Sequence, residues 1–278
     1  MAGRVEGKVA FITGAARGMG RAHAVTLARE GADIIAVDLL KQVDGVAYPM
    51  SNQEDLAETV RQVDALDRRI VAIQADVRDY DGLKLALDDG VAELGRLDIV
   101  SVNAGIVNYG LLEEFPEQIW QDMIDINLTG AWHTAKAAIP HLRTGGRGGS
   151  MIFSSSLAGQ IPFTTAGHYT AAKHGVVGMM RTFALELASE FIRSNAVLPG
   201  TINTPMVQNL RHFKKFRPDL ENPTLEDTVE VSRALNAIPV PWLESEDVSN
   251  AVLWLASDES RYVTGVAIPL DAGMGIKK

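Results

Sequence analysis

The stretch that most constrains the fold is a strand, glycine turn, helix and second strand at the start of the chain. Apolar residues run from Val9 to Thr13, and the glycine-rich turn Thr13–Gly20 follows them. A helix-forming stretch comes next, and a second apolar run then ends at Asp38. Glycine lets the backbone approach a pyrophosphate, and a helix start offers free amides and the positive end of its dipole. This order predicts a dinucleotide-binding unit.

Asp38 points to the identity of the dinucleotide. A carboxylate at the tip of the second strand can accept hydrogen bonds from ribose hydroxyls and repels a 2′-phosphate. Leu39 follows it, so no basic residue stands there for a phosphate, whereas Arg17 in the turn argues the other way. We therefore expect NAD rather than NADP. The expected contacts in this unit are Gly14, Arg17, Gly18, Met19, Gly20, Asp38 and Leu39.

The rest of the chain repeats the alternation of strands and helices. It predicts an α/β fold, a doubly wound Rossmann-type parallel sheet of about seven strands with helices on both faces. We expect a single domain over residues 1–278, with ligands at the carboxyl ends of the strands. After the first two strands, the predicted strands cover residues 70–75, 97–102, 150–154, 193–198 and 265–270, and the later helices residues 53–66, 79–94, 117–142, 168–190, 225–235 and 244–257.

Two segments do not fit this alternation. The connection at residues 39–52 is long, because most such links have about 2–6 residues. It is either a tolerated surface loop or a flap that slows cofactor exchange, and Ser51 or Asn52 can cap the helix after it. The second segment, residues 204–243, contains the basic and aromatic run 210–218 and predicts a lid over the active site.

Composition excludes several kinds of partner. The net charge of −9 over 278 residues argues against nucleic acid and anionic membrane surfaces. Cysteine is absent, which removes disulfides, a thiolate nucleophile and a zinc–thiolate site, and we expect no metal. No apolar run approaches the roughly 18 residues of a membrane span, and no signal peptide precedes the first strand. We expect a cytoplasmic protein.

A second motif carries the chemistry. Tyr169 and Lys173 are four residues apart on a predicted helix and so lie on one face. A neighbouring ammonium favours the phenolate, which would lower the pKa of the tyrosine from its usual value of about 10 toward the range of a general acid/base. Taken alone, the pair could also be an ordinary surface contact.

Together these motifs resemble the short-chain dehydrogenase/reductase family. They cover nearly the whole chain in the family's order, and the thirteen-residue step from Ser156 to Tyr169 is also the family's. The matching residues are the turn Thr13–Gly20, Asp76, Asn103, Ala104, Gly105, Asn127, Ser156, Tyr169, Lys173, Pro199, Gly200 and Thr204.

The resemblance implies hydride transfer between NAD(H) and a secondary alcohol or ketone. Tyr169 would be the general acid/base, Lys173 would hold the nicotinamide ribose, and Ser156 would bind the substrate oxygen. Asn127 would anchor a water that links Lys173 to solvent. The further cofactor contacts implied are Asp76, Val77, Asn103, Ala104, Gly105, Tyr169, Lys173, Pro199, Gly200, Ile202, Thr204 and Met206.

A finer resemblance is to the mycofactocin-coupled, carveol-dehydrogenase-like branch. It rests on the segment Gly3–Gly18, the 39–52 insertion and the long lid. It implies a tightly retained NAD, transfer of electrons to a peptide-derived carrier, mycofactocin, and a hydrophobic alicyclic or terpenoid substrate. The pocket would be lined by Ile106, Val107, Leu157, Ile161, Phe163, Met206 and the lid.

The family's usual assembly implies a homotetramer. Its helices would pair around residues 117–142 and 168–190, and the last strand would contribute. Trp120, Trp132, Met179 and Met180 are either interface or core residues.

Two alternatives on the same fold remain open. An epimerase or dehydratase that uses NAD transiently tends to have a longer carboxyl-terminal substrate domain than this chain. A non-catalytic NAD(P)-sensing protein commonly lacks the tyrosine or the lysine, and both are present here.

Overall fold

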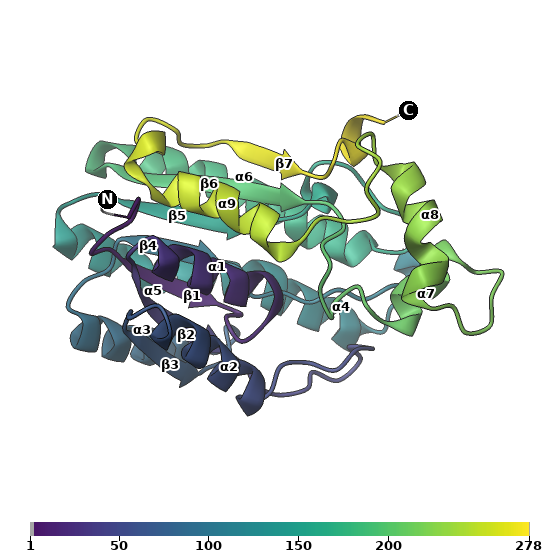
Figure 1. Cartoon of the computed structure of the whole chain (residues 1–278), viewed down its shortest axis with the longest axis horizontal. Coiled ribbons are helices and arrows are strands. Elements are labelled where there is room, and N and C mark those ends of the chain that lie inside the picture. Colours follow the sequence, from purple (N-terminus) through teal and green to yellow (C-terminus); the bar gives the residue numbers. More distant parts are fainter. Residues whose placement is uncertain (1–2, 278) are drawn as a thin grey trace.

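The computed structural model describes residues 3–277 and places a parallel sheet at the centre of the molecule (Figure 1). The strands are β1 (Val9–Thr13), β2 (Asp33–Asp38), β3 (Ile70–Gln74), β4 (Ile99–Val102), β5 (Gly149–Ser154), β6 (Ile192–Pro199) and β7 (Ala267–Leu270). The helices are α1 (Gly18–Arg29), α2 (Gln53–Asp64), α3 (Tyr80–Leu94), α4 (Glu117–Ile124), α5 (Gly130–Gly145), α6 (Gly167–Glu186), α7 (Leu210–Phe216), α8 (Leu225–Leu235) and α9 (Ser245–Ala256).

The sheet has seven strands in the order β3-β2-β1-β4-β5-β6-β7, and every neighbouring pair is parallel. The chain runs outward to β3, returns to the centre, and continues outward on the other side from β4. This reversal between β1 and β4 is the doubly wound arrangement, so the predicted fold class is confirmed. It brings the ends of β1 and β4 side by side.

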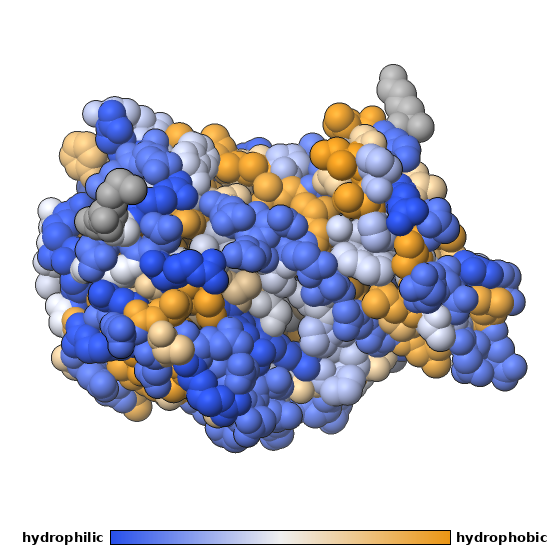
Figure 2. Space-filling view, viewed as in Figure 1, coloured by the Kyte–Doolittle hydropathy of each residue, from blue (hydrophilic) through white to orange (hydrophobic). Residues whose placement is uncertain are grey.

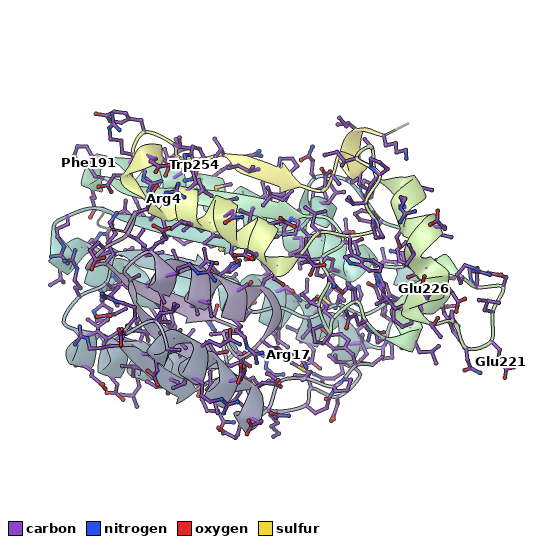
Figure 3. All side chains as sticks on the ribbon, in the orientation of Figure 1. Arg4, Arg17, Phe191, Glu221, Glu226 and Trp254 are labelled. Atoms are coloured by element: carbon purple, nitrogen blue, oxygen red, sulfur yellow. The ribbon has the colours of Figure 1, made fainter. Side chains whose placement is uncertain are left out.

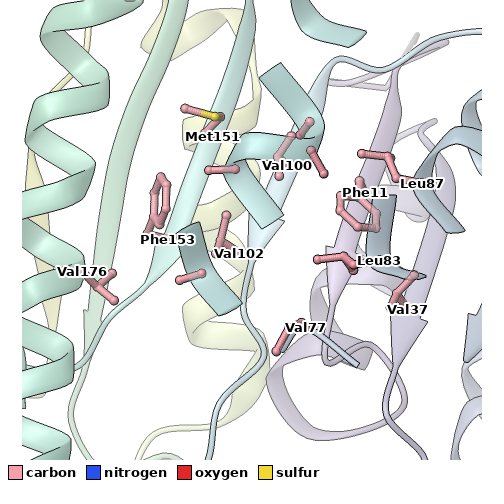
Figure 4. Close-up of a cluster of buried hydrophobic side chains, with 14 of the residues drawn as sticks. Phe11, Val37, Val77, Leu83, Leu87, Val100, Val102, Met151, Phe153 and Val176 are labelled. Carbon is pink, nitrogen blue, oxygen red and sulfur yellow. The ribbon is translucent and has the colours of Figure 1, made fainter. Parts of the chain in front are cut away.

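Helices cover both faces of the sheet because the strand residues alternate between them. Phe11 of β1 belongs to the core beneath α3, α5 and α6, whereas its neighbour Ile12 belongs to the core beneath α1 and α9. Figure 4 shows the first of these cores, in which Phe11 lies beside Leu87 and Phe153 lies farther along the sheet. Strands buried on both faces explain the continuous apolar runs in the sequence.

One predicted helix has a different geometry from the expectation. The stretch expected as a single helix over residues 117–142 is α4, a π-helical segment at Asp125–Thr129, and α5, joined without a break. A π segment adds a residue to the turn and is often found at functional sites. It lies around Asn127, one of the predicted site residues.

The two irregular segments lie toward one end of the molecule. The 39–52 insertion extends from β2 toward that end, and α7 and α8 of the 204–243 segment project there (Figure 1). Apolar side chains stand among the charged ones on this part of the surface (Figure 2), and exposed ones in the segment include Leu210, Leu235 and Ile238. Within residues 3–277, no helix combines the length and apolar character needed to cross a membrane.

Candidate active site

The predicted catalytic side chains meet where β5 ends and α6 begins. Ser156 follows β5, and its Oγ accepts a hydrogen bond from the amide of Ala158 at 3.1 Å. Tyr169 and Lys173 lie one turn apart on α6, with the Lys173 Nζ 5.5 Å from the centre of the Tyr169 ring. The Lys173 Nζ also donates to the carbonyl of Ser154 at 2.8 Å. Tyr169 and Lys173 therefore share one helix face, as the spacing predicted.

The electrostatics of this pair differ from the expectation. Burial raises the pKa of Tyr169, and the neighbouring Ser156 hydroxyl opposes that shift. Burial also lowers the pKa of Lys173 to about 8. The prediction that the charge of Lys173 lowers the phenol pKa is therefore wrong: burial and the Ser156 hydroxyl set that pKa, and desolvation disfavours the charged forms of both residues. The pKa of the Lys173 ammonium therefore lies closer to neutral pH than its usual value of 10.5.

Asn127 ties the helix to the loop after β4. Its Oδ1 accepts from the amide of Ile106 at 3.3 Å, and its Nδ2 donates to the carbonyls of Ile106 and Met123, each at 3.1 Å. A Cβ on Gly105 would come within 2.7 Å of the Asn127 Oδ1 and 3.5 Å of the Lys173 Nζ. The amide of Asn127 therefore lies near Lys173, but its hydrogen bonds go to backbone groups and, from Nδ2, to the Met123 Sδ at 3.0 Å.

The glycine turn forms one wall of a cleft that suits a dinucleotide. Gly14 has a φ of +68°, and a Cβ there would lie 2.9 Å from the Cα of Ala104. A Cβ on Gly20 would lie 1.9 Å from the carbonyl oxygen of Gly14. Arg17, the N-cap of α1, makes no side-chain capping hydrogen bond, and the first turn of the helix contains no acidic residue. The free amides at the start of α1 are therefore available to a phosphate.

The 39–52 insertion contacts Asp38, which is expected to bind the ribose, and Arg17, the cation that could reach a phosphate. Asp38 accepts hydrogen bonds from the amide of Ala16 at 2.9 Å and from the Ser51 hydroxyl at 2.6 Å. The Arg17 guanidinium donates to the carbonyl of Pro49, and Figure 3 shows Arg17 between the body of the molecule and this loop. Arg17, the residue whose charge favoured NADP, is therefore hydrogen-bonded to the insertion.

Most predicted cofactor residues line this cleft. They are Gly14, Arg17, Gly18, Met19, Gly20, Asp38, Leu39, Asp76, Val77, Asn103, Ala104, Gly105, Thr204 and Met206. Pro199 and Gly200 line a neighbouring cavity instead, together with Tyr169. The Ile202 side chain is buried, and its backbone pairs with Leu243 in an isolated bridge.

The neighbouring cavity has a volume of about 540 Å³ and lies under the 204–243 segment. Its lining is largely apolar, and it includes Ser156 and Tyr169. Met206 lines both the cavity and the cleft, so the two spaces adjoin at that residue. Of the side chains expected to line the pocket, Val107, Leu157, Ile161, Phe163 and Met206 do so, whereas Ile106 lines the cleft.

The sequence predicted the insertion and the lid as parts of the site but did not single out which of their residues line it. Tyr48 and Ser51 of the insertion line the cleft, and His212 and Lys215 of α7 line the cavity. The helical spacing of His212, Lys215 and Phe216 within the basic run could have shown that they share a face. The partners of Tyr48 and Ser51 are far along the chain or in another element, so no local pattern marked them.

Comparisons with known proteins agree with this geometry. Residues 14–275 match the family model described as enoyl-(acyl carrier protein) reductase. The (-)-trans-carveol dehydrogenase of Rhodococcus erythropolis is 53% identical over 275 residues, which cover 99% of each chain. The crystal structure of carveol dehydrogenase from Mycobacterium avium in complex with NAD is 58% identical, with a TM-score of 0.98 over 99% of this chain and 100% of that one.

A further solved structure is a short-chain dehydrogenase from Mycobacterium paratuberculosis bound to NAD, which is 46% identical. Its TM-score is 0.90, over 99% of this chain and 100% of that one. The family match spans nearly the whole chain, and the glycine turn, Ser156, Tyr169 and Lys173 stand in the places that the motifs predicted. The chain therefore belongs to the short-chain dehydrogenase/reductase family.

Proposed function

We propose that this protein is an NAD-dependent dehydrogenase of hydrophobic alicyclic or terpenoid secondary alcohols, with Tyr169 as the general acid/base. The observation that carries the proposal is that Tyr169 and Ser156 open into an apolar cavity next to the dinucleotide cleft. The names of two similar proteins support it, because the Rhodococcus relative is a carveol dehydrogenase and the Mycobacterium avium one was solved with NAD.

Each residue of the site has its own role in the proposed oxidation of the alcohol. When bound, the nicotinamide ring supplies the acceptor for the hydride of the carbinol carbon. Ser156 holds the substrate oxygen, and Tyr169 takes its proton as the alcohol becomes a ketone. Lys173 holds the nicotinamide ribose and offers a positive charge beside the phenol, and Thr204 holds the carboxamide. Asn127 anchors a water that passes the proton outward from Lys173.

The insertion supports a retained cofactor. Asn108 donates from its Nδ2 to the carbonyl of Gly45 at 2.6 Å, and the amide of Val107 donates to the Tyr48 hydroxyl at 3.3 Å. These contacts hold the insertion against the loop after β4, so it forms a flap over the adenosine end of the cleft. In this proposal the electrons leave to a carrier such as mycofactocin rather than by release of NADH.

The same proposal gives the chain its organisation. Residues 1–278 act as one Rossmann-type domain, with the flap at residues 39–52 and the substrate lid at residues 204–243. The protein works in the cytoplasm as a homotetramer.

The test is turnover by a Tyr169→Phe variant. Removal of the phenolic hydroxyl leaves no group to accept the proton, so the rate of alcohol oxidation should fall by roughly 10²–10⁴. NAD affinity, measured by calorimetry, should stay within about twofold. The matched control is Tyr262→Phe, because Tyr262 is 85% exposed. Substantial turnover by the Tyr169 variant on a panel of alicyclic alcohols would contradict the role given to Tyr169.

A further inference from the structure

The substrate cavity contains a cationic side chain that the proposed chemistry does not use. Lys215 of α7 lines the cavity and is partly buried. Its Nζ lies over the rings of Tyr109, Phe163 and Phe216, at 5.1, 5.3 and 5.8 Å from their centroids. Within residues 3–277, its Nζ makes no hydrogen bond and no ion pair. Three aromatic faces therefore surround an ammonium whose charge has no anionic partner.

The other polar groups nearby do not supply a negative charge. His212, one turn earlier on α7, has its Nδ1 2.9 Å from the Tyr109 hydroxyl. Burial, and then the charge of Lys215, lower the pKa of His212 to about 3, so the imidazole is neutral. Lys277 lines the cavity too, and its Nζ donates to the carbonyls of Ala234 and Asn236. Among the described residues that line the cavity, none is Asp or Glu.

The ammonium of Lys215 lies in the cavity without a counter-ion, although the chain as a whole carries a net charge of −9. Burial of an ammonium without a counter-ion is unfavourable, and burial lowers the pKa of Lys215. Contact with aromatic faces offsets only part of that, because a cation–π contact is worth roughly 0.5–2 kcal/mol. A carboxylate brought in by a ligand would supply the missing counter-charge.

We infer that the substrate of this enzyme carries a carboxylate remote from its carbinol carbon, and that Lys215 binds it. The inference rests on the proposed function and narrows the substrate class to alicyclic or similarly apolar hydroxy acids. Ser156 and Tyr169 would hold the carbinol oxygen, the apolar walls the ring, and Lys215 the acid group. Lys215 is then a specificity-determining residue, with Lys277 adding positive charge at the exposed rim.

Binding tests the inference without any turnover. The NAD-loaded protein is titrated with cyclohexanecarboxylate and with the neutral isostere cyclohexanecarboxamide. A charged hydrogen bond in a partly buried site favours the carboxylate by roughly ten- to a hundredfold. Lys215→Met, which removes the charge and keeps an unbranched apolar side chain, should abolish this preference, and Lys215→Arg should keep it. The matched control is Lys214→Met, because Lys214 is the exposed neighbour on the same helix.

Two results would overturn the inference. One is equal affinity of the wild-type protein for the two ligands. The other is a preference that survives in Lys215→Met, which would make Lys215 a latch that holds α7 on Tyr109 and Phe163. Lys215→Met could lose its lid structure, which would lower the melting temperature of the NAD-loaded protein. In that case Lys215→Gln is used, provided that it melts like the wild type. Loss of the carboxylate preference in Lys215→Gln supports the inference, and a preference that remains in Lys215→Gln overturns it.

Turnover separates the inference from the proposed function. Wild-type protein and Lys215→Met are assayed with 4-hydroxycyclohexanecarboxylate and with cyclohexanol. The inference expects the ratio of kcat/KM for the acid to kcat/KM for cyclohexanol to fall roughly tenfold or more in the variant, with the loss for the acid mostly in KM. An equal loss with both alcohols overturns the inference. A carboxylate preference in binding without oxidation of any alcohol overturns the proposed function and leaves the anion subsite supported.

Discussion

At the scale of single residues, burial of the proposed catalytic residue Lys173 destabilises the fold. Its side chain is 4% exposed, and burial lowers its pKa from 10.5 to about 8. Between those values the unfolded chain binds more protons than the folded one. Stability is therefore lowest below pH 8 and rises with pH across this window. A pKa shift of this size corresponds to about 3 kcal/mol.

Replacement of Lys173 by Met should therefore stabilise the cofactor-free protein. We expect a gain of about 1–3 kcal/mol in the free energy of unfolding at pH 7, with loss of turnover. The gain over wild type should shrink as the pH rises from 8 toward 10.5. Urea unfolding of both proteins at pH 7 and pH 9.5 measures it. A variant no more stable than wild type at pH 7 would show that burial of Lys173 does not destabilise the protein.

Asp38 is the residue expected to select NAD. Asp38→Ala removes the acceptor for ribose hydroxyls and the charge that repels a 2′-phosphate. We expect NAD affinity to fall roughly ten- to a hundredfold and the bias against NADP to shrink. Asp44→Ala is the control, because Asp44 is an exposed acid of the insertion. Unchanged selectivity, measured by calorimetry with both dinucleotides, would mean that another residue reads the ribose.

At the scale of elements, the insertion lines the cleft and is fixed to the body of the protein, which supports the proposed flap. Hydrogen bonds join Ser51 to Asp38, Pro49 to Arg17, Tyr48 to Val107 and Gly45 to Asn108, so four points along it are attached to the body. Asn52 caps α2 with a complete capping box, which leaves Ser51 free to turn toward Asp38. Of the two caps considered, the structure uses Asn52.

Detachment of the insertion should speed the release of NAD. Asn108→Ala removes the 2.6 Å hydrogen bond to the carbonyl of Gly45 and leaves the cleft lining unchanged. We expect the dissociation rate of NAD to rise roughly three- to tenfold, in line with one hydrogen bond. Exchange against labelled NAD measures this rate. Asn222→Ala, at an exposed site in the lid, should have no effect, and a rate unchanged by Asn108→Ala would leave the insertion without a role in retention.

At the scale of the whole molecule, the exposed aromatic residues of α4 and α5 bear on assembly. Trp120 is 36% exposed and Trp132 is 41% exposed. Met180, considered together with them, is completely buried in the core beneath α6 and is therefore not an interface residue. Large exposed aromatic side chains of this kind are enriched where subunits meet.

The proposed homotetramer should depend on Trp132. Sedimentation should give the wild-type protein four times the mass of one chain, and Trp132→Glu should lower that mass, because a carboxylate would be buried in the interface. Leu85→Glu on α3 is the control, since Leu85 is 61% exposed and lies outside the expected interface helices. A wild-type monomer, or a tetramer unaffected by Trp132→Glu, would contradict the proposed assembly.

Local patterns in the sequence determined the fold class and the catalytic pair. Continuous apolar strands, a glycine turn and an i, i+4 pair are each set by neighbouring residues, so the parallel sheet and the shared face of Tyr169 and Lys173 followed directly. The direction of the Tyr169 pKa shift could not be read from the sequence, because burial depends on every residue packed around the phenol.

Only the tertiary structure decided which distant residues complete the site. The Tyr109 hydroxyl meets His212, Asp38 meets Ser51, and the π-helical turn aims Asn127 at the loop after β4. These contacts depend on how the lid and the insertion close over the sheet, which no spacing along the chain encodes. The same packing brings Lys215 into an apolar cavity whose described lining contains no Asp or Glu, and this placement is the basis of the proposed carboxylate subsite.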